Sequence, residues 1–260
     1  MPPQDAGFGF RFRRPTPVVA ATLAVLLVVW VGFAVAVRFV PGGKDAYEAL
    51  AFDPDLVLRG SHLWSLLTGA LLHSLGDTDH LVFNGLVFYF FACDLEELWG
   101  RGRFVLFMIL CALGADAVVL LTAVLGLGNA PVVGFSGVVL GTLTAWGLTY
   151  PDREMLFLFF RLRGIHLVYV TLGMQLLTAL SFSKVSAAAH LGGMAAGAAF
   201  AMAQSGPLRR WWLRRKLSRL QTEATGVSGF SGGRPARGRG GLRVIQGGGG
   251  DPPKDKRYLN

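Results

Sequence analysis

Two residues of this chain, Ser136 and His190, have the chemistry of a nucleophile and a proton acceptor, and both stand in glycine-marked stretches of apolar sequence. Ser136 belongs to Gly134-Phe135-Ser136-Gly137, and His190 to Ala189-His190-Leu191-Gly192-Gly193. Polar and ionisable side chains are costly at membrane depth, so they generally have a function there. A histidine can take a serine proton and return it to a leaving amine. The pair therefore predicts serine hydrolase chemistry inside a membrane.

The Gly-x-Ser-Gly pattern by itself is weak, because the chain contains it three times. The other two copies, 226–229 and 229–232, lie in a polar, glycine-rich tail. Only Ser136 opens a predicted membrane helix. At that position its backbone N–H and the positive helix end can face a developing oxyanion.

Glycine spacing explains how the two side chains could meet. His190, Gly193 and Gly197 fall at i, i+3 and i+7, which is one helix face. Ser136 is followed by Gly137 and Gly141. Two faces of small residues allow backbones to pack closely. Plain helix packing would also account for the glycines, but it leaves the histidine unexplained.

A third polar pair, His80 and Asn84, is spaced i, i+4 on one face of an apolar, phenylalanine-rich run. Both side chains can donate hydrogen bonds, which suits an oxyanion hole. Alternatively, the two residues satisfy each other or a neighbouring backbone group. No acidic residue is well placed as a third triad member, because Asp116 falls in the middle of a predicted span. A Ser–His dyad is predicted, with neither metal nor cofactor.

The elements that position these residues are membrane helices. Of 260 residues, 52% are hydrophobic and 16% charged, and the mean hydropathy is positive. This composition is typical of an all-α, polytopic membrane protein, in which each span needs about 20 apolar residues. Six spans are predicted, over residues 18–38, 79–98, 103–126, 135–150, 165–182 and 187–204.

The fourth span is short, and the non-helical stretch 128–135 precedes it. A helix from Ser136 to Tyr150 covers about 22 Å at 1.5 Å per residue, less than the hydrocarbon core. Its first residue would then lie below the outer surface. Irregular backbone at that depth requires protein or a water-filled cavity around it, and hydrolysis requires that water.

The domain plan has a cytoplasmic segment (1–16), a membrane domain (17–205) and a basic tail (206–260). Residues 41–78 are expected as short helices in the outer interface. Arginines in alternate joints place both termini in the cytoplasm of a multi-pass cell-membrane protein. Asp94, Glu96 and Glu97 end the second span and are expected to contact Arg101 or Arg103.

The tail has 13 Lys or Arg against 3 Asp or Glu from Gly206 onwards, a surplus of +10. Since the formal net charge of the whole chain is +9, the rest of the chain is close to neutral. The tail's glycine and arginine content predicts disorder. Residues 209–219 predict a basic interfacial helix that meets anionic lipid heads. Arg/Gly tails can also bind nucleic acid, but a membrane anchor is the preferred interpretation, and no nucleic-acid partner is expected.

Taken together, three motifs make the chain resemble the rhomboid family of intramembrane serine proteases between about Trp64 and Gln204. They are His-x3-Asn (His80, Asn84), Gly-x-Ser-Gly (134–137) and Ala-His-x2-Gly-x3-Gly (Ala189, His190, Gly193, Gly197). Their order agrees with the six-helix core of that family.

The resemblance implies that Ser136 is the nucleophile and His190 the general base. It implies an oxyanion hole made by Asn84, His80 and the Ser136 amide, with the glycines as supporting residues. Single-pass membrane proteins, cut in or near their spans, are the implied substrates.

Three departures from the family pattern are visible. Trp64-Ser65 stands where the family has Trp-Arg. His73 precedes His80 by seven residues, a longer spacing than is usual in the family. Leu140 stands four positions after the serine, where the family often has an aromatic residue. Because that aromatic stacks on the histidine, a catalytically weak or inactive rhomboid-like protein that binds membrane clients remains the alternative.

Overall fold

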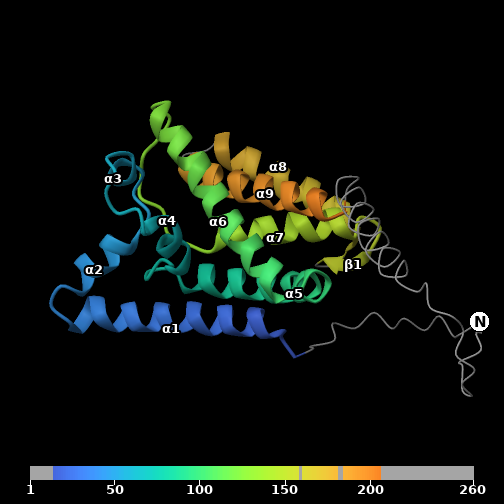
Figure 1. Ribbon diagram of the computed structural model, residues 1–260, viewed down its shortest axis with the longest axis horizontal. Coiled ribbons are helices and arrows are strands. Elements are labelled where there is room, and N and C mark those ends of the chain that lie inside the picture. The colour runs from blue at the N-terminus through green and yellow to red at the C-terminus, as the bar shows by residue number, and fades with distance from the viewer. Residues whose placement is uncertain (1–13, 158–159, 181–183, 206–260) are drawn as a thin grey trace, which may run out of the picture. The chain divides into compact units, whose positions relative to one another are not determined.

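The computed structural model describes residues 14–157, 160–180 and 184–205 of the chain. This part is mostly helical, and Figure 1 shows its long helices side by side. The predicted interfacial helix at 209–219, the disordered tail and most of the segment 1–16 lie outside the described residues.

A helix is present in each of the six ranges predicted as spans. These helices are α1 (Pro17–Phe39), α5 (Thr78–Trp99), α6 (Arg101–Val124), α7 (Ser136–Thr149), α8 (Gly164–Leu180) and α9 (Lys184–Ser205). Among the described residues, three segments are long and apolar enough to cross a membrane: Pro17–Phe39, Arg101–Val124 and Val185–Gln204. Helix α7 is only 14 residues long, and α5 has acidic residues at both ends. Six spans therefore stay a prediction.

The segment between α1 and α5 folds into short helices, as predicted. They are α2 (Gly43–Leu50), α3 (Pro54–Leu58), α4 (Ser65–Thr68) and the 3-10 helix η1 (Gly69–Leu71). The indole of Trp64 donates to the Ala49 carbonyl (2.9 Å), and the Thr68 hydroxyl to the Leu50 carbonyl (2.8 Å). These contacts anchor the segment internally although serine follows the tryptophan.

Helix α9 packs along both α6 and α7, and glycines form both contacts. A β-carbon at Gly193 would collide with the Gly137 carbonyl, and one at Gly197 with the Gly141 carbonyl. On the other side, a β-carbon at Gly192 would collide with the Gly114 carbonyl of α6. The two predicted glycine faces are thus brought together, backbone against backbone.

A cluster of aromatic side chains from α5, α6 and α9 fills part of the core of the bundle. Phe88, Phe104 and Phe107 are fully buried, and their neighbours pack edge to face with ring centroids 5.0–5.3 Å apart. By contrast, α1 and α8 expose large apolar side chains, as expected of helices that face lipid. The exposed residues with the largest fractions on these two helices are Val28, Phe39, Leu177 and Leu180.

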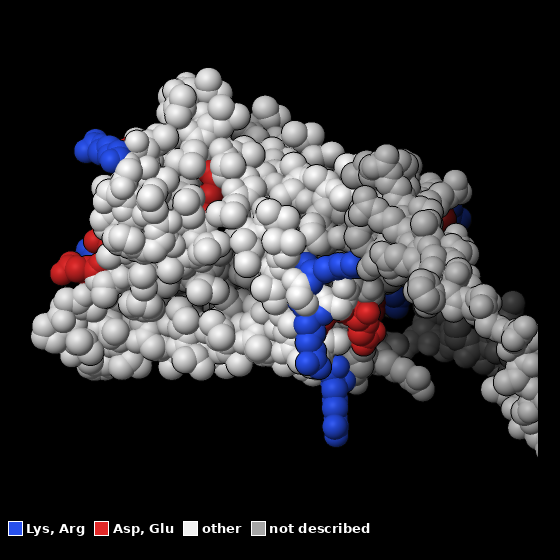
Figure 2. Space-filling view, in the orientation of Figure 1, with Lys and Arg blue, Asp and Glu red and all other residues white. Residues whose placement is uncertain are grey.

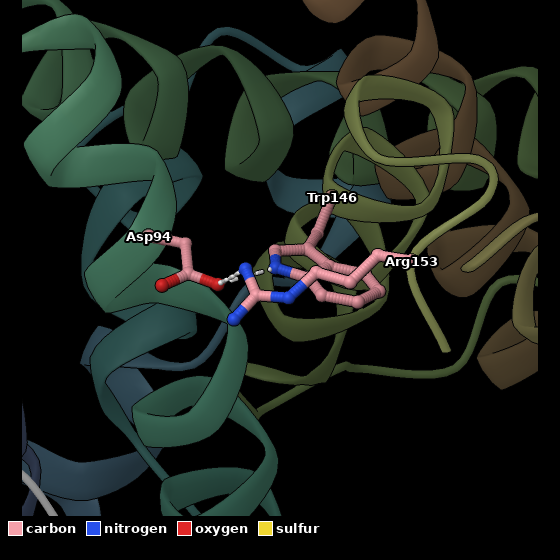
Figure 3. Close-up of polar contacts among 3 residues, drawn as sticks. All are labelled: Asp94, Trp146 and Arg153. Atoms are coloured by element: carbon pink, nitrogen blue, oxygen red, sulfur yellow. Dashed lines mark hydrogen bonds and ion pairs between the residues drawn. The ribbon is translucent and has the colours of Figure 1, made fainter. Parts of the chain in front are cut away.

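Two acidic residues at the end of α5, Asp94 and Glu96, have partners that the sequence analysis did not predict. Asp94 accepts from the Arg153 guanidinium (2.7 Å) and from the Trp146 indole (2.8 Å), so it ties α5 to the end of α7 (Figure 3). Glu96 is buried and accepts from the first backbone N–H groups of α1. These partners lie 52–78 residues away in the sequence, so spacing alone did not indicate them. The contact with Arg101 or Arg103 stays a prediction. On the face drawn in Figure 2, charged residues gather over α2 and α3 and near the end of α5, and the surface between is mostly uncharged.

The all-α prediction omitted one hairpin. Strand β1 (Glu154–Phe157) pairs antiparallel with β2 (Phe160–Arg163), with Glu154 opposite Arg163 and Met155 opposite Leu162. Met155 and Leu162 pack against the core, whereas Glu154 and Arg163 are exposed. This alternation is the period-two pattern of a strand. The prediction missed it because each strand has only four residues in the short connection between two apolar helices.

Candidate active site

Ser136 is the first residue of α7, and the stretch before it is held in an irregular conformation. Gly134 has a φ of +133°, a region that side chains rarely adopt. Its N–H donates to the Gly69 carbonyl (3.1 Å), so the stretch is tied to η1. A β-carbon at Gly134 would also lie 3.1 Å from the His80 ring. The positive φ favours glycine at this position, and the contact leaves little room for a side chain. Ser136 follows at a helix start, where backbone N–H groups lack intrahelical partners.

His190 lies on α9 and faces Ser136 across the glycine contact. The distance between its Nε2 atom and the Ser136 Oγ atom is 2.8 Å, within hydrogen-bond range. The structure thus brings together the two residues that the motifs singled out. In this arrangement the imidazole can accept the hydroxyl proton.

The opposite ring nitrogen of His190 has a partner that the sequence analysis missed. Its Nδ1 atom lies 2.7 Å from the Oε1 atom of Gln175 on α8. Gln175 is a buried polar side chain in a helix whose other residues are mostly apolar. A glutamine within a predicted span was the available signal, since buried polar groups in such helices need partners.

Asn84 is buried on α5 and contacts His73, a residue noted in the sequence only for its unusual spacing. The Asn84 Nδ2 atom lies 3.2 Å from the His73 Nε2 atom, which also accepts a longer hydrogen bond of 3.5 Å from the Phe135 backbone N–H. His73 therefore links Asn84 to the residue just before Ser136. Because a carboxamide nitrogen carries two hydrogens, this contact leaves Asn84 a second donor.

His80 borders the site from the first turn of α5. The side chain of Asp77 caps this helix by accepting from the His80 backbone N–H (3.2 Å). The His80 ring stands against Gly134, and its centroid lies 5.6 Å from that of His73. The His80 ring therefore lies beside Gly134, two residues before Ser136 in the sequence.

The electrostatics of the site disfavour protonation of His73. This residue is only 1% exposed and lies between η1 and α5, outside the long helices. Burial, and to a smaller extent the neighbouring His80 ring, lowers the pKa of His73 to about 4. At neutral pH the His73 ring is therefore an uncharged acceptor for the Phe135 amide.

A small cavity of about 20 Å³ lies beside the serine, and Ser136, Gly134 and Asp116 are among the residues that line it. A space of that size can hold a water molecule where polar partners are present. Asp116, on α6, is a polar residue in the lining of this cavity. Among the described residues no group of three or more His, Cys, Asp or Glu side chains could hold a metal ion.

A larger, mostly apolar cavity of about 510 Å³ lies between α1, α6 and the α4–η1 segment, and it shares Ala70, Ala112 and Val138 with the smaller one. It ends on Phe135 and Val138, which flank Ser136 in sequence. Apolar cavities of several hundred Å³ are the usual size for bound apolar groups.

The chain is similar to a known family of domains and to a curated bacterial protein. The family model described as "Rhomboid domain" matches residues 60–206, which include all three motifs. A Bacillus subtilis (strain 168) protein named "Putative rhomboid protease YdcA" is 35% identical over 95 residues, which is 36% of this chain. The match covers 45% of that protein, so the chain spans less than half of this relative's length.

Proposed function

Because the chain belongs to the rhomboid family, we propose that it is an intramembrane serine endopeptidase, which hydrolyses peptide bonds in or near the transmembrane segments of other membrane proteins. The observation that carries this proposal is the 2.8 Å distance between the Ser136 Oγ and His190 Nε2 atoms. A general base must lie this close to the proton that it abstracts. The position of Ser136 at a helix start adds unpaired N–H donors at the same point.

In the proposed reaction, the Ser136 oxygen attacks the substrate carbonyl carbon while His190 takes the hydroxyl proton. The resulting tetrahedral intermediate collapses when the C–N bond breaks, and His190 returns the proton to the leaving amine. Water then attacks the acyl-enzyme by the same route, and the released acid leaves Ser136 with its proton restored. No cofactor takes part in these steps.

The negative charge of the tetrahedral intermediate needs donors, and we assign this role to the Ser136 amide, Asn84 and His80. Asn84 is held by His73 next to Phe135, and His80 stands against Gly134. Fixed donors of this kind stabilise an oxyanion because they need no reorganisation during the reaction.

The apolar helices and the family indicate a multi-pass membrane protein. We propose further that all six long helices span the cell membrane as one domain, residues 17–205, with both termini in the cytoplasm. Helix α7 would begin below the outer surface, and the cavity beside Ser136 would admit the water. The basic tail would meet anionic lipid heads rather than nucleic acid.

A protein that binds membrane clients without cleaving them is the second candidate, because Leu140 replaces the aromatic residue of the family pattern. To separate the two, wild type, Ser136→Ala and His190→Ala would be reconstituted in liposomes with a single-span substrate. We expect a cleaved fragment with wild type alone. If folded wild type binds the substrate without cleaving it, the client-binding function is favoured. Equal cleavage by Ser136→Ala would exclude Ser136 as the nucleophile.

A further inference from the structure

From the contact between α8 and the active-site histidine, we infer that Gln175 is a positioning residue that fixes the tautomer and orientation of His190. The Gln175 Oε1 atom lies 2.7 Å from the His190 Nδ1 atom, opposite the nitrogen that faces Ser136. Serine, imidazole and carboxamide thus form one continuous line of hydrogen bonds through α7, α9 and α8. This inference rests on the proposed function.

The burial of Gln175 singles it out on its helix. It is 9% exposed, whereas its neighbours Met174 and Leu176 are 58% and 52% exposed. The side chain is therefore turned into the bundle while the adjacent ones face outward. A buried carboxamide without a partner is unfavourable, so its contact with the imidazole is a specific one.

The chemistry of the carboxamide oxygen determines which ring nitrogen carries the proton. An amide oxygen only accepts, so the hydrogen between Gln175 and His190 must lie on Nδ1. In neutral imidazole the other nitrogen, Nε2, then holds a free lone pair and can accept the Ser136 proton. The alternative tautomer, with hydrogen on Nε2, could not act as the base. Gln175 therefore selects the reactive tautomer.

This role corresponds to that of the carboxylate in a Ser-His-Asp triad, but without the charge. During the reaction the ring becomes positively charged, and the oxygen of Gln175 continues to accept from Nδ1–H. A neutral amide stabilises that cation less than a carboxylate does. Its removal is accordingly expected to reduce the rate less than loss of a triad aspartate.

Two substitutions test the inference, with a control on the same helix. Gln175→Leu preserves approximate size and removes the acceptor, whereas Gln175→Glu keeps an acceptor and adds charge. Met174→Leu changes an exposed side chain of α8 and is the control. For each folded variant, the rate of labelling by a fluorophosphonate and the cleavage of a single-span substrate would be measured between pH 5 and pH 9.

We expect Gln175→Leu to lower the labelling rate and kcat by about 10- to 100-fold, with little change in KM, because the ring loses its orientation. The midpoint of the acid limb should move to lower pH in Gln175→Leu and to higher pH in Gln175→Glu. These shifts follow because the two changes destabilise and stabilise the protonated ring, respectively. A residue that only packs would change folding or the amount of active protein without moving that midpoint.

The inference is overturned if Gln175→Leu labels at the wild-type rate with an unchanged pH profile. Failure of the proposed function looks different: wild type would not be labelled, or Ser136→Ala would be labelled equally. In that case, ¹⁵N-histidine NMR still tests the role of Gln175. The Nδ1–H tautomer of His190, assigned with the His190→Ala variant, must then predominate in wild type and decrease in Gln175→Leu. An Nε2–H tautomer in wild type would refute the inference.

Discussion

Gly193 of α9 lies directly against the carbonyl group of Gly137 in α7, with no room for a side chain between them. Gly137 follows Ser136, and Gly193 stands one turn after His190 on the same helix face. The backbone contact therefore sets the separation of the two helices at the level of the serine and the histidine. A change of a few tenths of an ångström here would be transmitted to their hydrogen bond.

Enlarging this contact should separate serine and histidine. In Gly193→Ala the added methyl group overlaps the Gly137 carbonyl, so α9 must move away, and we expect at least a 10-fold loss of cleavage. Overpacking of this kind also costs about 1–3 kcal/mol of stability. Gly173→Ala on α8 is the matched control, because a β-carbon there has nothing within 4 Å. The measurements are cleavage in liposomes and thermal unfolding in detergent, and equal behaviour of the two variants would contradict the prediction.

The second prediction concerns the oxyanion hole. Asn84→Ala should lower the cleavage rate by about 100- to 1,000-fold, the usual effect of losing one such donor. Asn84→Asp should also be strongly impaired, because a carboxylate cannot donate and repels the oxyanion. Asn129→Ala, which removes an exposed asparagine bonded to Asp55, is the control. A rate for Asn84→Ala within threefold of wild type would remove Asn84 from the proposed mechanism.

The sequence predicted much of this arrangement because its signals are local. Long apolar runs located the six helices, and the motifs around Ser136 and His190 predicted a contact that the structure contains. The contribution of Gln175 could not be predicted in the same way. Its partner lies 15 residues away on another helix, and one polar residue in an apolar run does not indicate which neighbour it meets. Likewise, the contacts of His73 with Asn84 and Phe135 depend on how the segment between α1 and α5 folds. No spacing in the sequence indicates them.

The third prediction is a loss of stability in mild acid that depends on His73. The pKa of His73 is lowered to about 4 in the folded protein, against about 6.5 in an unfolded chain. Between these values the unfolded state binds more protons, so the free energy of unfolding rises with pH across the window and is constant above it. At about 1.4 kcal/mol per unit, the contribution is at most about 3 kcal/mol between pH 4 and pH 7.

Thermal unfolding in detergent at pH 4.5 and pH 7 would check this prediction. We expect a smaller difference between the two pH values in His73→Asn and His73→Gln than in wild type, because neither replacement titrates. His166→Gln changes an exposed histidine and should retain the wild-type difference. Wild-type behaviour in both His73 variants would show that other groups cause the acid sensitivity.

The last prediction concerns Glu96, which caps the first turn of α1 from the end of α5. Its carboxylate, 3% exposed, accepts from the Val18 N–H (3.1 Å), the Val19 N–H (3.0 Å) and the Thr16 hydroxyl. The negative charge also complements the positive end of the helix dipole. Thr16, the N-cap residue itself, provides no side-chain cap. Glu96 thus joins the start of α1 to the end of α5, next to the buried Val19.

Replacing this carboxylate should loosen α1 while leaving the active site intact. We expect Glu96→Gln to lower the free energy of unfolding by about 1–2 kcal/mol, since the charge and one acceptor are lost. Glu96→Ala should cost more, because buried N–H groups are then left unpaired. Glu48→Gln is the control, because this glutamate of α2 is exposed and pairs only across the surface with exposed Lys44. Fluorophosphonate labelling of folded Glu96→Gln should proceed at the wild-type rate, since Ser136 and His190 lie on α7 and α9. A large loss of labelling with unchanged stability would instead mean that α1 contributes to the site itself.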